Sequence, residues 1–336
     1  MLCTLSSCGI SYKFINENFP VIFYLLRRIL YTIPIALGVS LICFMLVHIA
    51  PGDPINAIAP PDAPLDVVAQ LKHDYGLDKP LPVQFSIWLI RVAQGDLGHS
   101  LVTGRSVWEE LKDAIGNTLR LSLVAATIGF FLGSVFGATA AAFRGTWIDR
   151  TLVALAVTGV SLPHYWLGMV LVVIFAVLLN ILPAMGAGPG GMAWIWDWEH
   201  MQFLILPALT LSAIPMGIIT RTVRGIVVEV LNQDFVTTLR GKGLLKSHIF
   251  NHVLKNVAPS ASAVMGLQLG YLMGGSILVE TVFSWPGTGL LLNNAIFQRD
   301  IPMLQGTILV LAMLFVSLNL IVDLIQTTLD PRIKRS

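Results

Sequence analysis

The sequence predicts an all-α integral membrane protein with six transmembrane helices, both termini in the cytoplasm, and a helical insertion outside the membrane after the first span. Three observations support this fold class. Hydrophobic residues make up 55% of the 336 residues and charged residues only 12%, about half the charged share of an average soluble domain. Six stretches contain the roughly 20 apolar residues that a spanning helix requires. The short connections between them alternate between rich and poor in Lys and Arg.

The predicted spans contain no Asp or Glu, and the last one ends just before Asp323. If the N-terminus is inside, the inner segments hold 14 Lys and Arg residues, whereas the outer loops after the third and fifth spans hold none and one, Arg299. Positive charges favour the cytoplasmic side, so both termini are expected there. The six spans are residues 29–50, 121–143, 151–179, 203–220, 257–279 and 303–322.

The first span is preceded by an extension and followed by an outer insertion. His48, near the end of this span, is expected to be a packed residue rather than a ligand. In the insertion, Gly76 and Gly95 end two amphipathic helices, and Ser106 with Glu109 has the spacing of a capping box that begins a third. The insertion either contacts a receptor that delivers substrate or only seals the bundle. The expected divisions are an extension that is disordered or precedes the natural start (1–22), the first helix (23–50), the insertion (51–116), a five-helix domain (117–328) and a cytoplasmic tail (329–336).

Three of the spans carry residues that shape helix packing. Glycines recur every fourth residue in the second span, at 129, 133 and 137, and such a stripe permits close contact with another helix. Pro163 is expected to kink the third span and to free a backbone carbonyl. Pro207 and Pro215 should weaken the fourth span, which suits a segment that bends when the bundle opens.

Polar residues inside the spans are few, and they are candidates for a translocation path. His164 is the one ionisable residue well inside an apolar run, which makes it a functional candidate. Gln268 and Tyr271 are the polar members of the fifth span. An ion-coupled secondary transporter is an alternative reading, but such proteins usually carry several ionisable groups near the midplane and repeated halves.

The polar segment between the fourth and fifth spans, residues 225–256, is called the elbow below. Val227, Leu231 and Phe235 recur at helical spacing, so one helix is expected through these residues. Gly241 and Gly243 should end that helix, and a second, short helix is expected over residues 247–256. The pattern predicts a helix-turn-helix on the membrane surface. A channel or a structural membrane protein would leave this segment unexplained.

The elbow resembles the cytoplasmic "EAA" loop of binding-protein-dependent ABC importer permeases, in their dipeptide and oligopeptide branch. That loop typically reads Asp-Tyr-x-Arg-Thr-Ala-Arg-Ala-Lys-Gly-Leu. This chain departs from it at Thr237, Leu239 and Gly241, where the family more often has Arg, Ala and Ala. The matching residues are Asp234, Phe235 in place of Tyr, Thr238, Arg240, Lys242, Gly243 and Leu244.

A second motif, after the fifth span, resembles the same family almost letter for letter. It reads Glu-Thr-Val-Phe-Ser-Trp-Pro-Gly-Thr-Gly, where the family has Leu as the ninth residue. Its aromatic residues are expected to anchor a re-entrant outer segment, and its Pro and Gly residues to form the turns. The resemblance covers about residues 24 to 336. The motif residues expected to matter are Glu280, Phe283, Trp285, Pro286, Gly287 and Gly289.

This resemblance implies a type I ABC permease subunit in the cytoplasmic membrane of a prokaryote, moving di- or oligopeptides inward. Nickel-chelate and glutathione importers resemble this branch too, so these substrates stay open. The implied partners are a second, homologous permease, two ABC ATPases, an extracytoplasmic solute-binding protein and membrane lipid. ATP and Mg²⁺ would be bound by the ATPases. The elbow residues would couple to the ATPases, with Gly243 the least replaceable.

The sequence also argues against several other activities. It contains no GxxxxGK[ST] phosphate loop, so the chain is expected not to hydrolyse ATP itself. His248 and His252 are four residues apart, but no third ligand is near them in sequence, and no metal site is expected. The three Cys residues are scattered without metal-ligand spacing. Basic residues do not cluster with aromatics as nucleic-acid binding requires.

Overall fold

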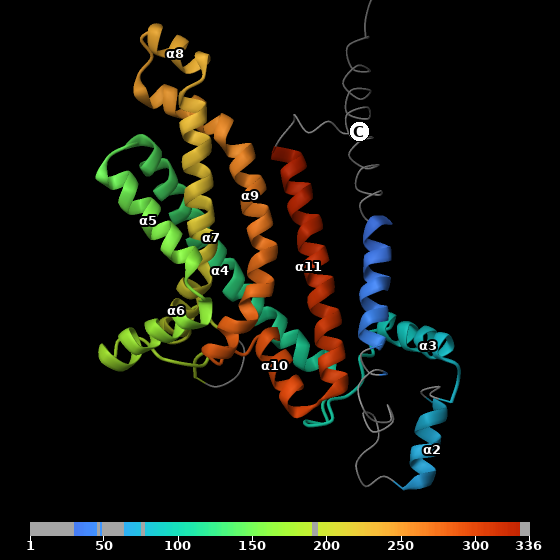
Figure 1. The fold of residues 1–336 in the computed structure, drawn as a ribbon. Helices are drawn as coiled ribbons and strands as arrows, with labels where there is room; N and C mark the ends of the chain where they lie inside the picture. Colours follow the sequence, from blue (N-terminus) through green and yellow to red (C-terminus); the bar gives the residue numbers. More distant parts are fainter. Residues whose placement is uncertain (1–29, 46–47, 49–63, 75–77, 190–193, 330–336) are drawn as a thin grey trace, which may run out of the picture.

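The computed structural model describes residues 30–45, 48, 64–74, 78–189 and 194–329, and the described residues are almost entirely helical (Figure 1). Their only β-type pairing is an isolated bridge between His99 and Ser106. The predicted extension, residues 1–22, and most of the predicted tail lie outside the described residues. The all-α membrane fold is confirmed, with elements that differ from the predicted spans in three places.

Four helices are long and apolar enough to cross a membrane, and a fifth crossing exists if two strongly bent helices form one span. A shorter apolar helix, Leu30–Met45, precedes them, and the rest of the predicted first span lies outside the described residues except His48. The count of six spans is therefore not reproduced one for one. The four long helices are α4 (Val107–Ala142), α7 (Trp198–Leu231), α9 (Lys246–Val282) and α11 (Ile301–Leu329).

The third predicted span is wrong as a single kinked helix. Its residues form α5 (Trp147–Ser161), then α6 (His164–Leu171) and η2 (Val172–Leu178), and the two parts meet at an angle of 107°. The cause lies in two consecutive residues. Leu162 has ψ 131° and Pro163 has ψ 136°, and the residue before a proline is driven out of the helical region. Two extended residues in succession change the direction of the helix axis far more than a proline kink, in which a single backbone hydrogen bond is lost.

The outer insertion contains two short helices, α2 (Leu65–Asp74) and α3 (Leu81–Ala93). Gly95, with φ of +84°, follows the second of them as predicted, whereas Gly76 lies outside the described residues. The third predicted helix begins at Val107, but it is not separate, because it continues into the second span as the 36-residue α4. No Pro interrupts this stretch, and Ser106 makes no capping hydrogen bond with its side chain.

The N-terminal apolar helix is tied to the insertion and to α11. His48 has its Nε2 3.1 Å from Oε1 of Gln84 in α3, and its ring centroid is 4.3 Å from that of Phe44. Gln305 of α11 donates a hydrogen bond to the backbone oxygen of Cys43, at 3.1 Å. His48 is thus a packed residue, as the sequence indicates.

The elbow differs from prediction at both of its helix boundaries. The fourth span runs without interruption through Pro207 and Pro215 as α7, which takes in Val227 and Leu231 and ends there, so the single helix expected through Phe235 is divided in two. Gln233 is extended, with ψ of 149°, and it begins the separate helix α8 (Asp234–Gly241). The predicted short second helix is only the first part of the 37-residue α9. The elbow therefore contains the ends of two membrane helices, α7 and α9, with α8 between them.

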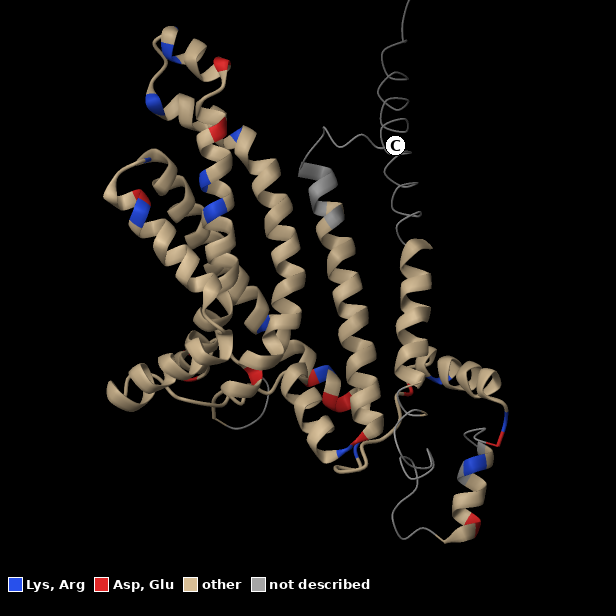
Figure 2. Ribbon diagram, viewed as in Figure 1, with Lys and Arg blue, Asp and Glu red and all other residues tan. Residues whose placement is uncertain are grey.

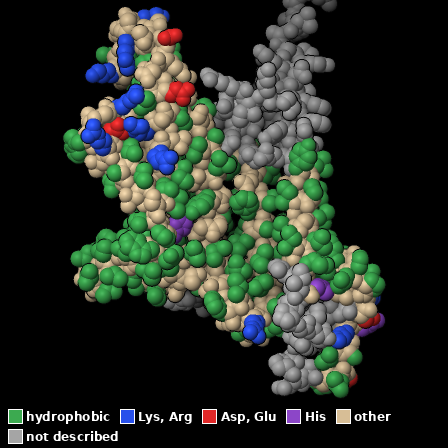
Figure 3. Space-filling model, in the orientation of Figure 1, with side chains coloured by type: hydrophobic (Ala, Val, Ile, Leu, Met, Phe, Trp, Pro, Cys, Tyr) green, Lys and Arg blue, Asp and Glu red, His purple; other side chains and the backbone are tan. Residues whose placement is uncertain are grey.

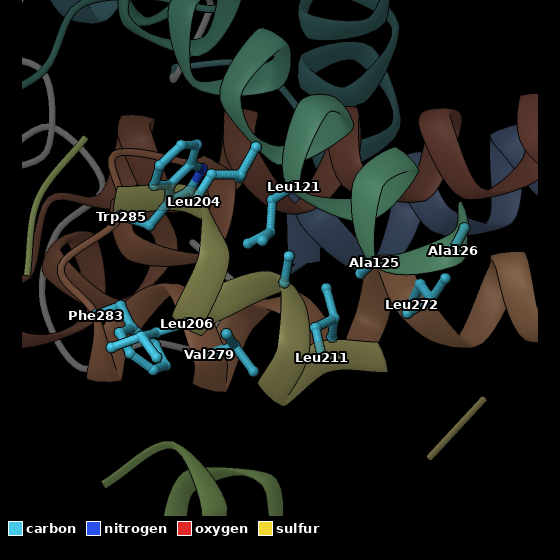
Figure 4. Packing of buried hydrophobic residues seen from close by; sticks show 11 residues of the cluster. Leu121, Ala125, Ala126, Leu204, Leu206, Leu211, Leu272, Val279, Phe283 and Trp285 are labelled. Atoms are coloured by element: carbon cyan, nitrogen blue, oxygen red, sulfur yellow. The ribbon is translucent and has the colours of Figure 1, made fainter. Parts of the chain in front are cut away.

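The glycine stripe of the second span packs directly on α7. A Cβ atom at Gly137 would lie 2.6 Å from the backbone oxygen of Thr220, and one at Gly133 would lie 2.8 Å from that of Met216. No real side chain tolerates these distances, so the stripe serves helix packing, as predicted. Beside this contact lies the largest apolar cluster, which joins α4, α7 and α9 (Figure 4).

Charge is distributed unevenly along the bundle. Figure 2 shows Lys and Arg gathered around α8 and the connection between α4 and α5, at one end of α7, while α10 (Thr288–Gln298) lies at the opposite end. In the space-filling view, apolar side chains cover α6 and the middle of the molecule between these ends (Figure 3). An excess of Lys and Arg marks the cytoplasmic side, so α8 is cytoplasmic and α10 faces outward.

Candidate functional site

The elbow turn is built around Gly243. This residue has φ of +74°, as expected from its place after a helix. Its N–H donates to the oxygen of Arg240 at 3.0 Å, and the N–H of Leu244 donates to that of Leu239 at 3.2 Å. These two bonds form a Schellman motif, which satisfies the last carbonyls of α8 and needs a residue with positive φ. The turn is thus a defined structure rather than a flexible link.

One face of α8 is anchored by apolar contacts. Val236 is fully buried, in a cluster that includes Val230 of α7 with Ile249 and Val253 of α9. Phe235, Leu239 and Leu244 are partly buried against this cluster. Val236 does not belong to the residues identified from sequence, although its helical spacing to Leu239 is a usable signal. These contacts anchor α8 to the ends of α7 and α9.

The other face of α8 is polar and exposed. The hydroxyl of Thr238 donates to the backbone oxygen of Asp234 at 3.0 Å, one turn earlier, so it is satisfied within the helix. His248 and His252 are exposed on the first turns of α9, and the described residues contain no group of three or more His, Cys, Asp or Glu placed to hold a metal ion. Of the seven elbow residues predicted for coupling, five are exposed, namely Asp234, Thr238, Arg240, Lys242 and Gly243.

At the outer end, Glu280 joins three helices. Its carboxyl group is fully buried, and it accepts hydrogen bonds from the hydroxyl of Thr118 in α4 at 2.8 Å and from the N–H of Gly289 at 2.6 Å. The N–H of Leu290 also points to it, at 3.3 Å. These N–H groups belong to the first turn of α10, whose donors have no partner within the helix. Glu280 therefore caps α10 and ties it to α4.

The remaining motif residues complete this outer joint, defined as residues 280–289 with Asn117 and Thr118. The indole N–H of Trp285 donates to the oxygen of Asn117 at 3.1 Å, and the amide of Asn117 donates to the oxygen of Pro286 at 2.9 Å. A Cβ atom at Gly287 would lie 2.5 Å from Cδ of Glu280. Phe283 and Trp285 are buried in the core instead of lying at a membrane interface. The residues of this motif thus hold α4, α9 and α10 together.

Asn117 and Thr118 were not identified from sequence. They precede their partners by more than 160 positions, and nothing in the local pattern of α4 marks them.

Beside the joint lies a cleft of about 480 Å³, lined among others by Arg105, Asp113 and Trp194. The cleft at the outer end is thus lined by charged side chains of both signs, such as Arg105 and Asp113.

Two of the three residues predicted for a translocation path lie together. The hydroxyl of Tyr271 in α9 is 3.2 Å from Nε2 of His164, which is buried at the break between α5 and α6. Gln268 lies one turn before Tyr271, and within the described structure its buried Oε1 has no hydrogen-bond partner. The break in the third span therefore places a polar pair between α6 and α9.

Comparison with known proteins finds matches over most of the chain. Residues 133–335 match the family described as "Binding-protein-dependent transport system inner membrane component", and residues 21–122 match the N-terminal region of such membrane components. The glutathione transport system permease protein GsiC of Salmonella choleraesuis is 40% identical over 312 residues, covering 93% of this chain and 98% of that protein. The dipeptide transport system permease protein DppB of Alkalihalophilus pseudofirmus is 37% identical over 330 residues, covering 93% and 99%.

The fold itself has a solved counterpart. A chain of the inward-facing MetNI methionine ABC transporter superposes with a TM-score of 0.53 at 17% identity, covering 66% of this chain and 96% of that chain. It shares the helical arrangement. The family match over most of the sequence, together with relatives that are 37–40% identical over 93% of the chain, shows that the chain belongs to the binding-protein-dependent transport system inner membrane components, as a multi-pass permease subunit of a bacterial ABC importer.

Proposed function

We propose that this permease carries short peptides into the cell as one of two homologous membrane subunits, driven by two ATPase subunits that dock on the elbow. The observation that carries the proposal is the construction of the elbow. Its turn is closed by two backbone hydrogen bonds, its apolar face is anchored on α9, and its polar face is exposed at the cytoplasmic end. A surface of this kind suits docking to a soluble partner and not burial in lipid.

Movement of the elbow would reach the membrane directly. α7 and α9 extend from the elbow through the bundle as helices of 34 and 37 residues. When the ATPases bind ATP and Mg²⁺ and close, α8 would be displaced, and both helices would transmit that displacement. The bundle would then switch between two arrangements that open to opposite sides. The binding protein would deliver substrate at the outer end.

Short peptides are the substrate class that the relatives support. One similar protein is named for dipeptides and another for glutathione, which is itself a tripeptide with free carboxylates. Neither of these two names refers to a metal chelate.

The test is a reconstituted complex. The chain would be co-expressed with a second permease and the ATPases, placed in liposomes, and supplied with binding protein loaded with a dipeptide or with glutathione. We expect ATP hydrolysis to rise with loaded binding protein and labelled peptide to accumulate only when ATP is present. Accumulation driven by a proton or sodium gradient without ATP would contradict the proposal.

We further propose that His164, Gln268 and Tyr271 lie on the translocation path. Removing the hydroxyl of Tyr271 with Tyr271→Phe keeps the ring but deletes its contact with His164. We expect the KM for peptide uptake to change severalfold, because a polar group facing the substrate would be lost. Tyr165→Phe is the matched control, since Tyr165 neighbours His164 in sequence and is 48% exposed. Equal uptake kinetics in both variants would remove Tyr271 from the path.

A further inference from the structure

An ion pair with one buried partner joins the cytoplasmic turn before α5 to α7, since Asp149 is buried and the side chain of Arg224 is 32% exposed. Asp149, in the first turn of α5, is 4% exposed. It accepts hydrogen bonds from Nε of Arg224 at 2.6 Å and from Nη2 at 2.8 Å. A third bond comes from the N–H of Gly145, at 3.0 Å. Two parallel bonds from one guanidinium fix both the distance and the orientation of the two groups, so this pair restricts how α5 moves relative to α7.

The pair lies next to the elbow along the chain. Arg224 precedes the end of α7 at Leu231 by seven residues, which is about two helical turns. Asp149 follows the turn between α4 and α5, where Gly145 has φ of +82°. The pair therefore connects α7, the helix that leads into the elbow, with the cytoplasmic turn between α4 and α5.

Close backbone contacts extend this connection along three helices. A Cβ atom at Gly137 of α4 would lie 3.1 Å from the backbone nitrogen of Arg224, and 2.6 Å from the oxygen of Thr220. A Cβ atom at Gly217, two turns before Arg224 on α7, would meet the backbone oxygen of Ala156 in α5 at a distance shorter than any real contact. Contacts as close as these leave little room for sliding, so α4, α5 and α7 have the geometry of one unit.

We infer that Asp149 and Arg224 are positioning residues for coupling: their pair makes α4 and α5 follow α7 when the elbow moves, so that the displacement reaches the α5–α6 break beside Tyr271. The inference rests on the proposed docking of ATPases at the elbow. Without the pair, α7 would still be displaced, but the backbone contact near Ala156 would hold only the later part of α5 to it, and the cytoplasmic first turn of α5 would follow incompletely. ATP would then be hydrolysed with less transport for each ATP.

Asp149→Asn tests this in the reconstituted complex. Asn keeps the size of the side chain but removes its charge and the strong bidentate contact. We expect normal amounts of assembled complex, ATP hydrolysis within about twofold of the original, and a ratio of peptide transported to ATP hydrolysed lowered about tenfold, within the range seen for residues that carry coupling between sites. A purely structural role would lower complex abundance and leave that ratio unchanged.

Two further variants keep the result interpretable. Asp149→Asn combined with Arg224→Gln removes both charges, so no unpaired charge burdens folding, and the transport ratio should stay low. Arg150→Gln removes an exposed cation from the adjacent position, and it should leave the ratio unchanged. An unaltered ratio in both the single and the double variant would overturn the inference.

The elbow variant Gly243→Asp separates this inference from the proposed function. If Gly243→Asp uncouples transport but both Asp149 variants transport normally, only the role of the ion pair is wrong. If Gly243→Asp also transports normally, docking at the elbow is wrong, and the role of the pair falls with it.

Discussion

Replacing Gly243 by Asp is expected to leave the permease in the membrane and to abolish peptide uptake, while its ATPases continue to hydrolyse ATP. Gly243 has φ of +74°, and no atom lies within 4 Å of where its Cβ would be. A side chain therefore fits sterically, and the left-handed backbone costs about 1–2 kcal/mol. That cost falls on the turn between α8 and α9 and not on the membrane bundle. The added carboxylate also changes the surface that would dock on an ATPase.

Gly241→Asp is the matched control for this prediction. Gly241 is the last residue of α8, is exposed, and likewise has open space at its Cβ position, but its backbone is right-handed. It should retain most of the uptake. Membrane abundance by immunoblot, uptake of labelled peptide and ATP hydrolysis would be measured for both variants. Equal loss of uptake in the two would assign the effect to charge alone, and normal uptake by Gly243→Asp would disprove the role of the turn.

Replacing Glu280 by Ala is expected to destabilise the protein by about 3 kcal/mol or more, because it leaves buried donors without a partner. The N–H of Gly289, the N–H of Leu290 and the hydroxyl of Thr118 all point to this carboxyl group. Loss of the cap also frees the first turn of α10. Thermal unfolding of the purified permease in detergent, followed by intrinsic Trp fluorescence, would report the change.

Glu280→Gln should be milder than Glu280→Ala. The amide oxygen of Gln can still accept from the first turn of α10, and its amide can donate to the hydroxyl of Thr118. Glu199→Ala is the exposed control, since Glu199 also lies in the first turn of a helix at the outer end, and it should change the unfolding free energy by less than about 0.5 kcal/mol. A melting temperature unchanged by Glu280→Ala would contradict the role assigned to the joint.

The fold class was predictable because a membrane-spanning helix requires a long apolar stretch that is visible in the sequence itself. Apolar length and the position of Lys and Arg depend on the bilayer and not on which helices pack together. The same holds for local turn chemistry, and the positive φ of Gly243 and of Gly95 followed from glycine after a helix. These properties need only the chain and its immediate solvent.

Helix boundaries were less predictable where a helix continued into or out of the membrane. The sequence suggested separate short helices near Ser106 and Lys246, but both segments belong to long helices, α4 and α9. At Pro163 the opposite error occurred, since two extended residues produced a bend of 107° rather than a kink. Packing partners and the backbone conformation of a neighbouring residue determine where such helices begin, end or bend. Neither can be read from the hydropathy of the sequence.

The sequence by itself determined the membrane class of this protein, the family motifs and the glycine that closes the elbow turn. Only the tertiary structure decided what the outer motif does and which distant residues complete it. Glu280 needs Thr118, and Asp149 needs Arg224, across 162 and 75 positions of the chain. A hydrogen bond depends on distance and direction in space, and a linear pattern contains neither until the helices have packed.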